Sequence, residues 1–125
     1  MSQQPPIEKV NLAEKFNLFE EHWSPKIAGE VGDAYVKLVK FRGEFVWHKH
    51  DTEDEMFFVV KGEITIKLRE GDVRLGEGEF VIIPRGVEHK PFAEEEAHVL
   101  LFEPKTVLNT GNVTNERTRP ELERV

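Results

Sequence analysis

The sequence has no cysteine in its 125 residues, and positive charges are outnumbered. The missing cysteine excludes disulfide bonds, thiolate metal sites and cysteine nucleophiles. Lysine and arginine number 17 against 24 aspartate and glutamate residues, which gives a formal net charge of −7. That balance, with no basic run to oppose it, argues against nucleic acid or an anionic membrane as a partner.

Targeting segments and long apolar runs are also missing. Residues 1–6 have neither the basic start nor the apolar core of a signal peptide. No apolar run approaches the length of a membrane span, and no Gly-rich phosphate loop indicates a nucleotide site. We therefore expect a cytoplasmic protein that binds neither nucleic acid nor membrane.

Short alternating segments, separated by glycine and proline, fill most of the chain. In residues 64–69, Ile64, Ile66 and Leu68 alternate with polar residues, as in a strand with one buried face. Further strands are expected at residues 22–29, 34–41, 56–60, 73–75, 80–83, 89–92 and 97–103. About eight to ten such strands predict an all-β sandwich or barrel. The acidic run at residues 94–96 is expected to be a solvated turn.

The predicted strands divide the chain into three parts. Residues 1–21 form an N-terminal arm, in which Asn11 is expected to cap a short helix over residues 12–19. Residues 22–104 form the barrel, and residues 105–125 form a polar C-terminal tail. The length suits a single domain with a real core.

One stretch between two predicted strands concentrates metal-binding side chains. His48 and His50 are two residues apart, so on a strand both would point to the same face. Residues 51–54 are polar enough to form a turn, and Glu55 starts the next apolar strand. A short turn would bring Glu55 beside the two imidazoles, and this combination outlines a metal site.

A fourth candidate ligand follows further along the chain. Residues 80–83 are apolar throughout, and Pro84 and Gly86 then form a sharp turn before His89. Proline stops a strand and glycine permits a tight bend, so this turn directs His89 back towards the sheet interior.

Together the two segments resemble the paired motifs of the cupin family. The first motif is Gly, a short spacer, His-x-His, a few residues, Glu, six residues and Gly; it is matched at Gly43, His48, His50, Glu55 and Gly62. The second is Gly, five residues, Pro-x-Gly, two residues and His; it is matched at Gly78, Pro84, Gly86 and His89. The spacer after Gly43 is one residue shorter than usual, and Ala93 stands where the family often has asparagine.

The resemblance covers residues 34–103 and implies a fold, a metal site and an assembly. The implied fold is a single-domain jelly-roll β-barrel, as in small uncharacterised bacterial cupins, some of which are labelled mannose-6-phosphate isomerase-like. The implied metal ligands are His48, His50, Glu55 and His89. A divalent Fe, Mn, Ni, Zn, Co or Cu ion suits three imidazoles and one carboxylate. Small cupins commonly pair, so the resemblance also implies a homodimer.

Four further residues are candidates for the pocket around the ion. Phe57 and Val59 share a strand face with Glu55, so both are expected to flank the metal. Arg85 lies in the Pro-Arg-Gly turn, where it either meets an anionic substrate or faces solvent. His98 either points into the barrel as a proton shuttle or is a buried, hydrogen-bonded histidine. Its lack of converging partners favours the second interpretation.

Two classes of function fit this site. The first is an enzyme that acts on a small organic substrate, either as a dioxygenase or as a Lewis-acid isomerase. Sugar-phosphate isomerisation ranks lower, because Arg85 and one lysine are the only evident cations for a pocket. The second class is a non-catalytic module that binds a small ligand or a metal ion.

Overall fold

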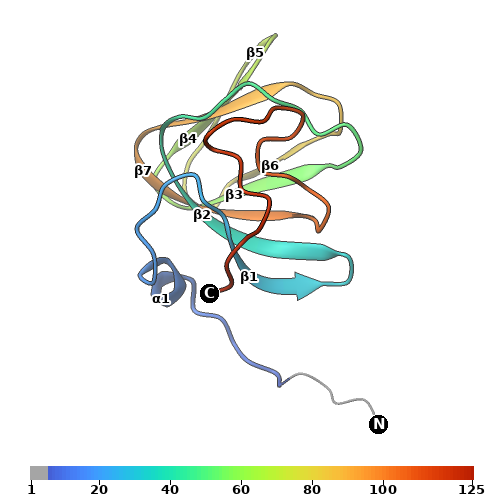
Figure 1. The fold of residues 1–125 in the computed structure, drawn as a ribbon. Coiled ribbons are helices and arrows are strands. Elements are labelled where there is room, and N and C mark those ends of the chain that lie inside the picture. The colour runs from blue at the N-terminus through green and yellow to red at the C-terminus, as the bar shows by residue number, and fades with distance from the viewer. Residues whose placement is uncertain (1–5) are drawn as a thin grey trace.

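Residues 6–125, which the computed structural model describes, form seven β-strands and one short helix (Figure 1). In chain order they are α1 (Leu12–Phe16), β1 (Lys26–Val31), β2 (Ala34–Glu44), β3 (Glu55–Lys61), β4 (Ile64–Leu68), β5 (Gly71–Leu75), β6 (Phe80–Ile83) and β7 (His89–Pro104). The predicted all-β fold is therefore confirmed. The first five residues of the predicted N-terminal arm lie outside the described residues. No helix in the described part is long and apolar enough to cross a membrane.

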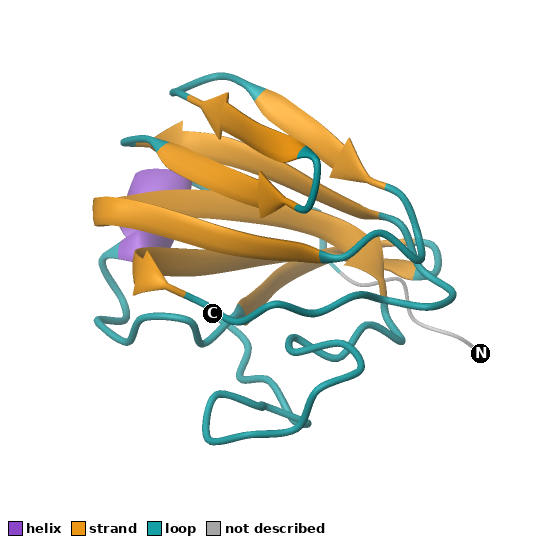
Figure 2. Cartoon of the chain, turned by 90° about the horizontal axis from the view of Figure 1, so that it is seen from above, coloured by secondary structure: helices purple, strands orange, loops and turns teal. Residues whose placement is uncertain are grey.

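The strands pair antiparallel and form layers that share β7 (Figure 2). Residues 89–92 of β7 pair with β4, and residues 98–102 pair with β3. β2 runs beside β7 along most of its length, and the strand order of the main sheet is β1-β2-β7-β3-β6. A long strand that takes part in both layers closes the sheet into a barrel, as in a jelly roll.

The prediction of a turn at residues 94–96 was wrong. These glutamates are exposed, but they lie within β7, which continues from residues 89–92 to residues 98–102 as one strand. The pairing of β2 with β7 shifts register between Phe41 and Gly43, opposite the acidic run. A bulge accommodates the extra residues and keeps the ladder on both sides, so long-range pairing overrides the local turn signal.

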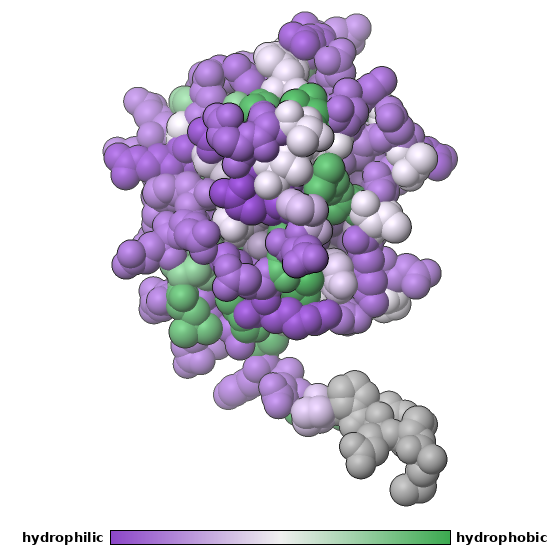
Figure 3. Space-filling view, viewed as in Figure 1, coloured by the Kyte–Doolittle hydropathy of each residue, from purple (hydrophilic) through white to green (hydrophobic). Residues whose placement is uncertain are grey.

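One apolar core fills the space between the layers. Alternate side chains of the strands enter it, as predicted for Ile64 and Ile66. Its buried members are Trp23, Val39, Phe41, Phe57, Val59, Ile64, Ile66, Leu75, Ile83, Ala93, Ala97, Val99 and Leu101. Burying each large apolar side chain contributes about 1.5–3 kcal/mol. The face of the molecule in Figure 3 is by contrast mainly hydrophilic, with small apolar patches.

Segments near both ends of the chain pack against the barrel. Asn11 caps α1, because its Oδ1 accepts a hydrogen bond from Glu14 N at 3.0 Å. The helix ends earlier than predicted, at Phe16, whose buried ring packs on the outer side of β2. Residues 105–125 turn repeatedly beside the barrel (Figure 1), and Val125 N donates to a carbonyl of β1 at 3.0 Å.

Candidate metal centre

Three imidazoles and one carboxylate meet at one place inside the barrel. They belong to His48, His50, Glu55 and His89, whose ligand atoms all lie within 4.8 Å of one another. All four side chains are buried. The structure therefore brings together the residues that the sequence singled out as one set.

Backbone pairing holds two of the histidines in register. His48 N donates to His89 O at 3.0 Å, and His89 N donates to His48 O at 2.9 Å. A third bond runs from Gly86 N to His50 O at 2.8 Å. His48 and His50 lie in an extended segment between β2 and β3, outside any regular strand. Their two-residue spacing still directs both imidazoles to the same side.

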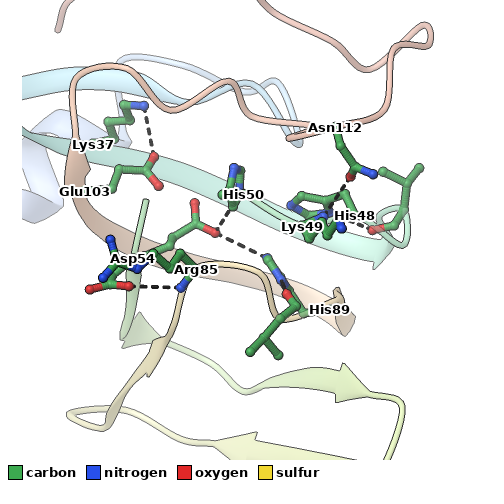
Figure 4. Close-up of polar contacts among 12 residues, drawn as sticks. Lys37, His48, Lys49, His50, Asp54, Arg85, His89, Glu103 and Asn112 are labelled. Carbon is green, nitrogen blue, oxygen red and sulfur yellow. Dashed lines mark hydrogen bonds and ion pairs between the residues drawn. The ribbon is translucent and has the colours of Figure 1, made fainter. Parts of the chain in front are cut away.

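Glu55 enters the site from the first position of β3, where it pairs with Ile83 at the end of β6. The turn after β6 is anchored nearby, because Asp54 Oδ1 accepts a hydrogen bond from Arg85 N at 2.9 Å (Figure 4). This turn leads the chain to His89, the first residue of β7. The Pro-x-Gly segment thus delivers the fourth ligand to the other three.

Backbone carbonyls orient two of the imidazole rings. His48 Nδ1 lies 2.9 Å from Val46 O, and His89 Nδ1 lies 2.9 Å from Val87 O. A ring that donates a hydrogen bond from Nδ1 carries no proton on Nε2 when it is neutral. The carbonyls therefore favour the tautomer in which Nε2 can bind a metal ion.

Three of the converging atoms have no hydrogen-bond partner among the described residues. They are His50 Nε2, His89 Nε2 and Glu55 Oε1. The two nitrogens lie 3.3 Å and 3.4 Å from this one oxygen (Figure 4). Burying a polar atom unpaired costs about 1–3 kcal/mol. A cation between them would satisfy all three atoms at once, so the residues fit a divalent metal ion.

The charge states at the site suit the same role. Burial, together with the neighbouring His89, lowers the pKa of His48 to about 4, so this imidazole is neutral near pH 7. Burial opposes the ionisation of Glu55, but its close neighbours Glu103, His50 and His89 hold the pKa of its carboxyl well below the usual range. Neutral imidazole and ionised carboxylate are the forms that bind metals.

A buried lysine and a second buried glutamate adjoin this carboxylate. Lys37 Nζ lies 2.9 Å from Glu103 Oε1. Burial and the charge of Glu55 raise the pKa of Glu103 well above its usual range. Glu103 was not among the predicted site residues. Its position in the alternation with buried Val99 and Leu101 was the signal available in the sequence.

A small cavity with mainly apolar walls adjoins the four ligands. Its volume is about 30 Å³, which is room for roughly one or two water molecules. His48 and Glu55 form part of its wall. The other lining residues are Trp23, Pro25, Val39, Phe41, Phe45, Phe57, Pro91, Leu101 and Asn109. Two of the four candidate ligands, His48 and Glu55, therefore face a space that is mainly apolar and partly aromatic.

Trp23 shapes this cavity, although no pattern in the sequence indicated it. Its ring stacks on Phe41 and Phe45 with centroids 4.4 Å and 4.8 Å apart, and its Nε1 donates to Arg42 O at 2.8 Å. An edge strand was predicted over residues 22–29, but β1 begins only at Lys26. Trp23 has a φ of 60°, which few residues other than glycine adopt, and this local bend is not visible in the strand pattern.

Two of the four predicted pocket residues lie inside the barrel. Phe57 lines the cavity, and its ring centroid is 5.9 Å from that of His89. Val59 is fully buried in the apolar core. Strand parity therefore placed both on the inner face, and Phe57 is the one that reaches the cavity.

The other two predicted pocket residues lie elsewhere. Arg85 is exposed on the turn after β6. His98 stacks on Phe16 of α1 with centroids 4.5 Å apart, and its Nε2 lies 3.1 Å from Glu96 Oε2. The structure does not bring either residue to the four ligands.

The fold, the motif spacing and the buried ligand set together define the class of protein. Residues 35–116 match the family of the Cupin domain. The chain belongs to the cupin family, as its motifs indicated.

Three relatives are informative. The chain is similar to the crystal structure of a cupin-2 domain containing protein from Shewanella frigidimarina NCIMB 400, with 47% identity, a TM-score of 0.76, and coverage of 77% of this chain and 94% of that one. It is 36% identical over 72 residues to the uncharacterized protein YdbB of Bacillus subtilis (strain 168), covering 57% of this chain and 63% of that protein. It is 32% identical over 81 residues to a 3-hydroxyanthranilate 3,4-dioxygenase of Ruegeria pomeroyi, covering 61% of this chain and 45% of that protein. The chain thus spans less than two thirds of either curated relative.

Proposed function

We propose that this cupin is a metal-dependent enzyme acting on a small organic substrate. A divalent transition metal ion would be held by His48, His50, Glu55 and His89. The observation that carries the proposal is the convergence of buried, unpaired Nε2 and Oε1 atoms on one point. Without a cation, each of these atoms would stay buried and unpaired, which costs free energy.

The donor set limits the choice of ion. Three imidazoles and one carboxylate, with no thiolate anywhere in the sequence, suit Fe, Mn, Ni, Zn, Co or Cu. These ligands carry a single negative charge, so a divalent ion would keep one positive charge. That charge favours a substrate with an anionic or chelating oxygen.

The walls of the cavity indicate what kind of substrate could approach. The ion, when bound, would supply oxygen activation for a dioxygenase or Lewis-acid polarisation of a carbonyl for an isomerase. The aromatic walls would exclude water and hold the apolar body of the substrate. No cationic side chain is among the described residues that line the cavity, which disfavours a sugar phosphate. The similarity to a protein named as a dioxygenase supports the first reaction.

The second candidate function is a non-catalytic module that binds a metal ion or small ligand. The observation in its favour is the cavity volume of about 30 Å³, which holds water but no organic substrate unless the walls move.

Oxygen consumption separates the two functions. Fe(II)-loaded protein would be mixed with a panel of chelating diols, diketones and hydroxyarenes, with His50→Ala as the control for free iron. Uptake that depends on both a substrate and His50 supports the dioxygenase. An isomerase would convert a substrate in the same panel without oxygen uptake, whereas a binding module would leave every compound unchanged.

We also propose that two copies pair through the outer face of β6, β3 and β7. Phe80 and Ile82 of β6 are apolar but 58% and 53% exposed. Met56 of β3 lies opposite Ile82 on one side and opposite Phe102 of β7 on the other, so apolar side chains run across the sheet. Exposed apolar surface that is continuous across strands marks an interaction site more often than a free surface.

A further inference from the structure

Two ionisable side chains occupy barrel positions that the strand pattern assigns to apolar residues. Along β2, Lys37 faces the same way as buried Val39, and along β7, Glu103 faces the same way as buried Leu101. Lys37 lies opposite Leu101 in the ladder, so it also lies near Glu103. The Nζ to Oε1 distance is 2.9 Å, and each side chain is only 1% exposed (Figure 4).

Stability alone does not account for this buried pair. Taking two such groups out of water is costly, and apolar side chains of similar volume are often as stabilising or more so. The position of Glu103 offers another explanation. Met56 pairs with Phe102 in the ladder, so Glu103 lies next to Glu55 across the two strands, and both side chains are buried. Glu55 is the only acidic member of the ligand set.

We propose that Lys37 and Glu103 are positioning residues that fix the carboxylate of Glu55 for the metal ion. This role rests on the proposed metal site. Glu55 Oε1 lies 3.3 Å and 3.4 Å from the Nε2 atoms of His50 and His89. It has to stay between them to bind the same metal ion. A glutamate side chain rotates freely unless a partner restrains it, and Glu103 is itself held by Lys37.

The expected effect is on metal binding. Groups that hydrogen-bond a metal ligand typically change metal affinity by about 10- to 100-fold when they are removed. Removal of the buried pair should therefore weaken binding by that factor and alter the coordination geometry, while all four ligands remain in the chain.

The variants are chosen so that folding and positioning separate. The double variant Lys37→Met with Glu103→Leu removes both charges together, so that neither is left buried and unpaired. Glu103→Gln keeps an amide that can donate to Glu55 and accept from Lys37, so it should retain affinity within about threefold, far from the loss expected on removal. The matched control is Lys26→Met, because Lys26 is another buried lysine, with Nζ 2.7 Å from Glu21.

Metal affinity would be measured by competition with a chromophoric chelator, using Co(II) and Zn(II). The visible absorption of the Co(II)-loaded protein reports ligand geometry independently of activity. The proposal expects weaker binding and a changed Co(II) spectrum in the double variant, and both unchanged in Lys26→Met and Glu103→Gln. A folded double variant with wild-type affinity and spectrum would overturn it. If the double variant does not fold, Glu103→Gln would be compared with Glu103→Ala. Equally weakened metal binding in these two variants would then overturn the proposal.

The same titration distinguishes this failure from failure of the metal site. If the wild-type protein bound neither ion, the proposed function would fall, and the positioning role with it. If the wild-type protein bound tightly and the folded double variant bound equally well, the metal site would stand and only the positioning role would be wrong.

Discussion

Replacing Gly111 by alanine tests whether the C-terminal segment holds the backbone of the candidate metal ligands in place. A Cβ at Gly111 would overlap Lys49 O and lie 2.9 Å from Lys49 C and 3.0 Å from His48 Cδ2. Lys49 is the residue between the ligands His48 and His50. Two hydrogen bonds reinforce the contact, since Asn112 N donates to Lys49 O at 3.0 Å and Lys49 N donates to Asn112 Oδ1 at 2.9 Å (Figure 4).

Gly32 provides a matched control. Both glycines have a φ of 57°, but a Cβ at Gly32 would meet nothing within 4 Å. Alanine in this left-handed region costs about 1–2 kcal/mol, which is the whole effect expected for Gly32→Ala. At Gly111 the overlap also displaces the Lys49 carbonyl, and each of the two hydrogen bonds lost costs about 0.5–1.5 kcal/mol. Gly111→Ala should therefore lower the free energy of unfolding by about 2–5 kcal/mol.

Two measurements check this expectation. Urea unfolding followed by tryptophan fluorescence gives the free energies, and competition titration gives the metal affinity. Gly111→Ala should weaken metal binding, because a displaced Lys49 moves the imidazoles on both sides of it. Gly32→Ala should leave metal binding unchanged. Equal losses of stability and equal metal affinities in the two variants would refute the reasoning.

Two further predictions concern pH and assembly. The metal-free protein should become less stable on acidification, because the pKa of His48 is about 4 when folded against 6.5 when unfolded, so the unfolded state binds more protons between these values. The contribution of His48 to the free energy of unfolding, up to about 3 kcal/mol, is complete above pH 6.5 and is lost towards pH 4. A free energy of unfolding in urea that did not fall between these pH values would contradict the prediction. Ile82→Lys should convert a dimer to monomers in analytical ultracentrifugation, whereas Val31→Lys, at a residue 60% exposed on β1, should not. A dimer that survived Ile82→Lys intact would exclude the β6 face.

Local spacing accounts for most of what the sequence predicted. His48 and His50 converge because they are two residues apart in extended chain, even though they lie outside a regular strand. The Pro-x-Gly turn accounts for His89, and the alternation of Ile64 and Ile66 accounts for their burial. These features depend on a few neighbouring residues, so a pattern in the sequence is enough to find them.

The features that were missed depend on contacts between distant segments. Lys37 and Glu103 meet only because β2 and β7 are neighbours, and the alternation that places each on an inner face does not show that the two pair. Trp23 reaches the cavity through a local bend at positive φ. The continuity of β7 through residues 94–96 depends on a bulge against β2. Such pairings require the register of the whole sheet, which no single segment specifies.

The most direct test of the central claim is the metal content of the purified protein. The chain would be purified without a histidine tag or a chelating column and analysed for metals by mass spectrometry, together with His50→Ala and His89→Ala. A single set of four ligands predicts about one divalent transition metal ion per wild-type chain and almost none in either variant. Stoichiometric metal in both variants, or a wild-type protein that takes up no metal on reconstitution, would contradict the proposed site.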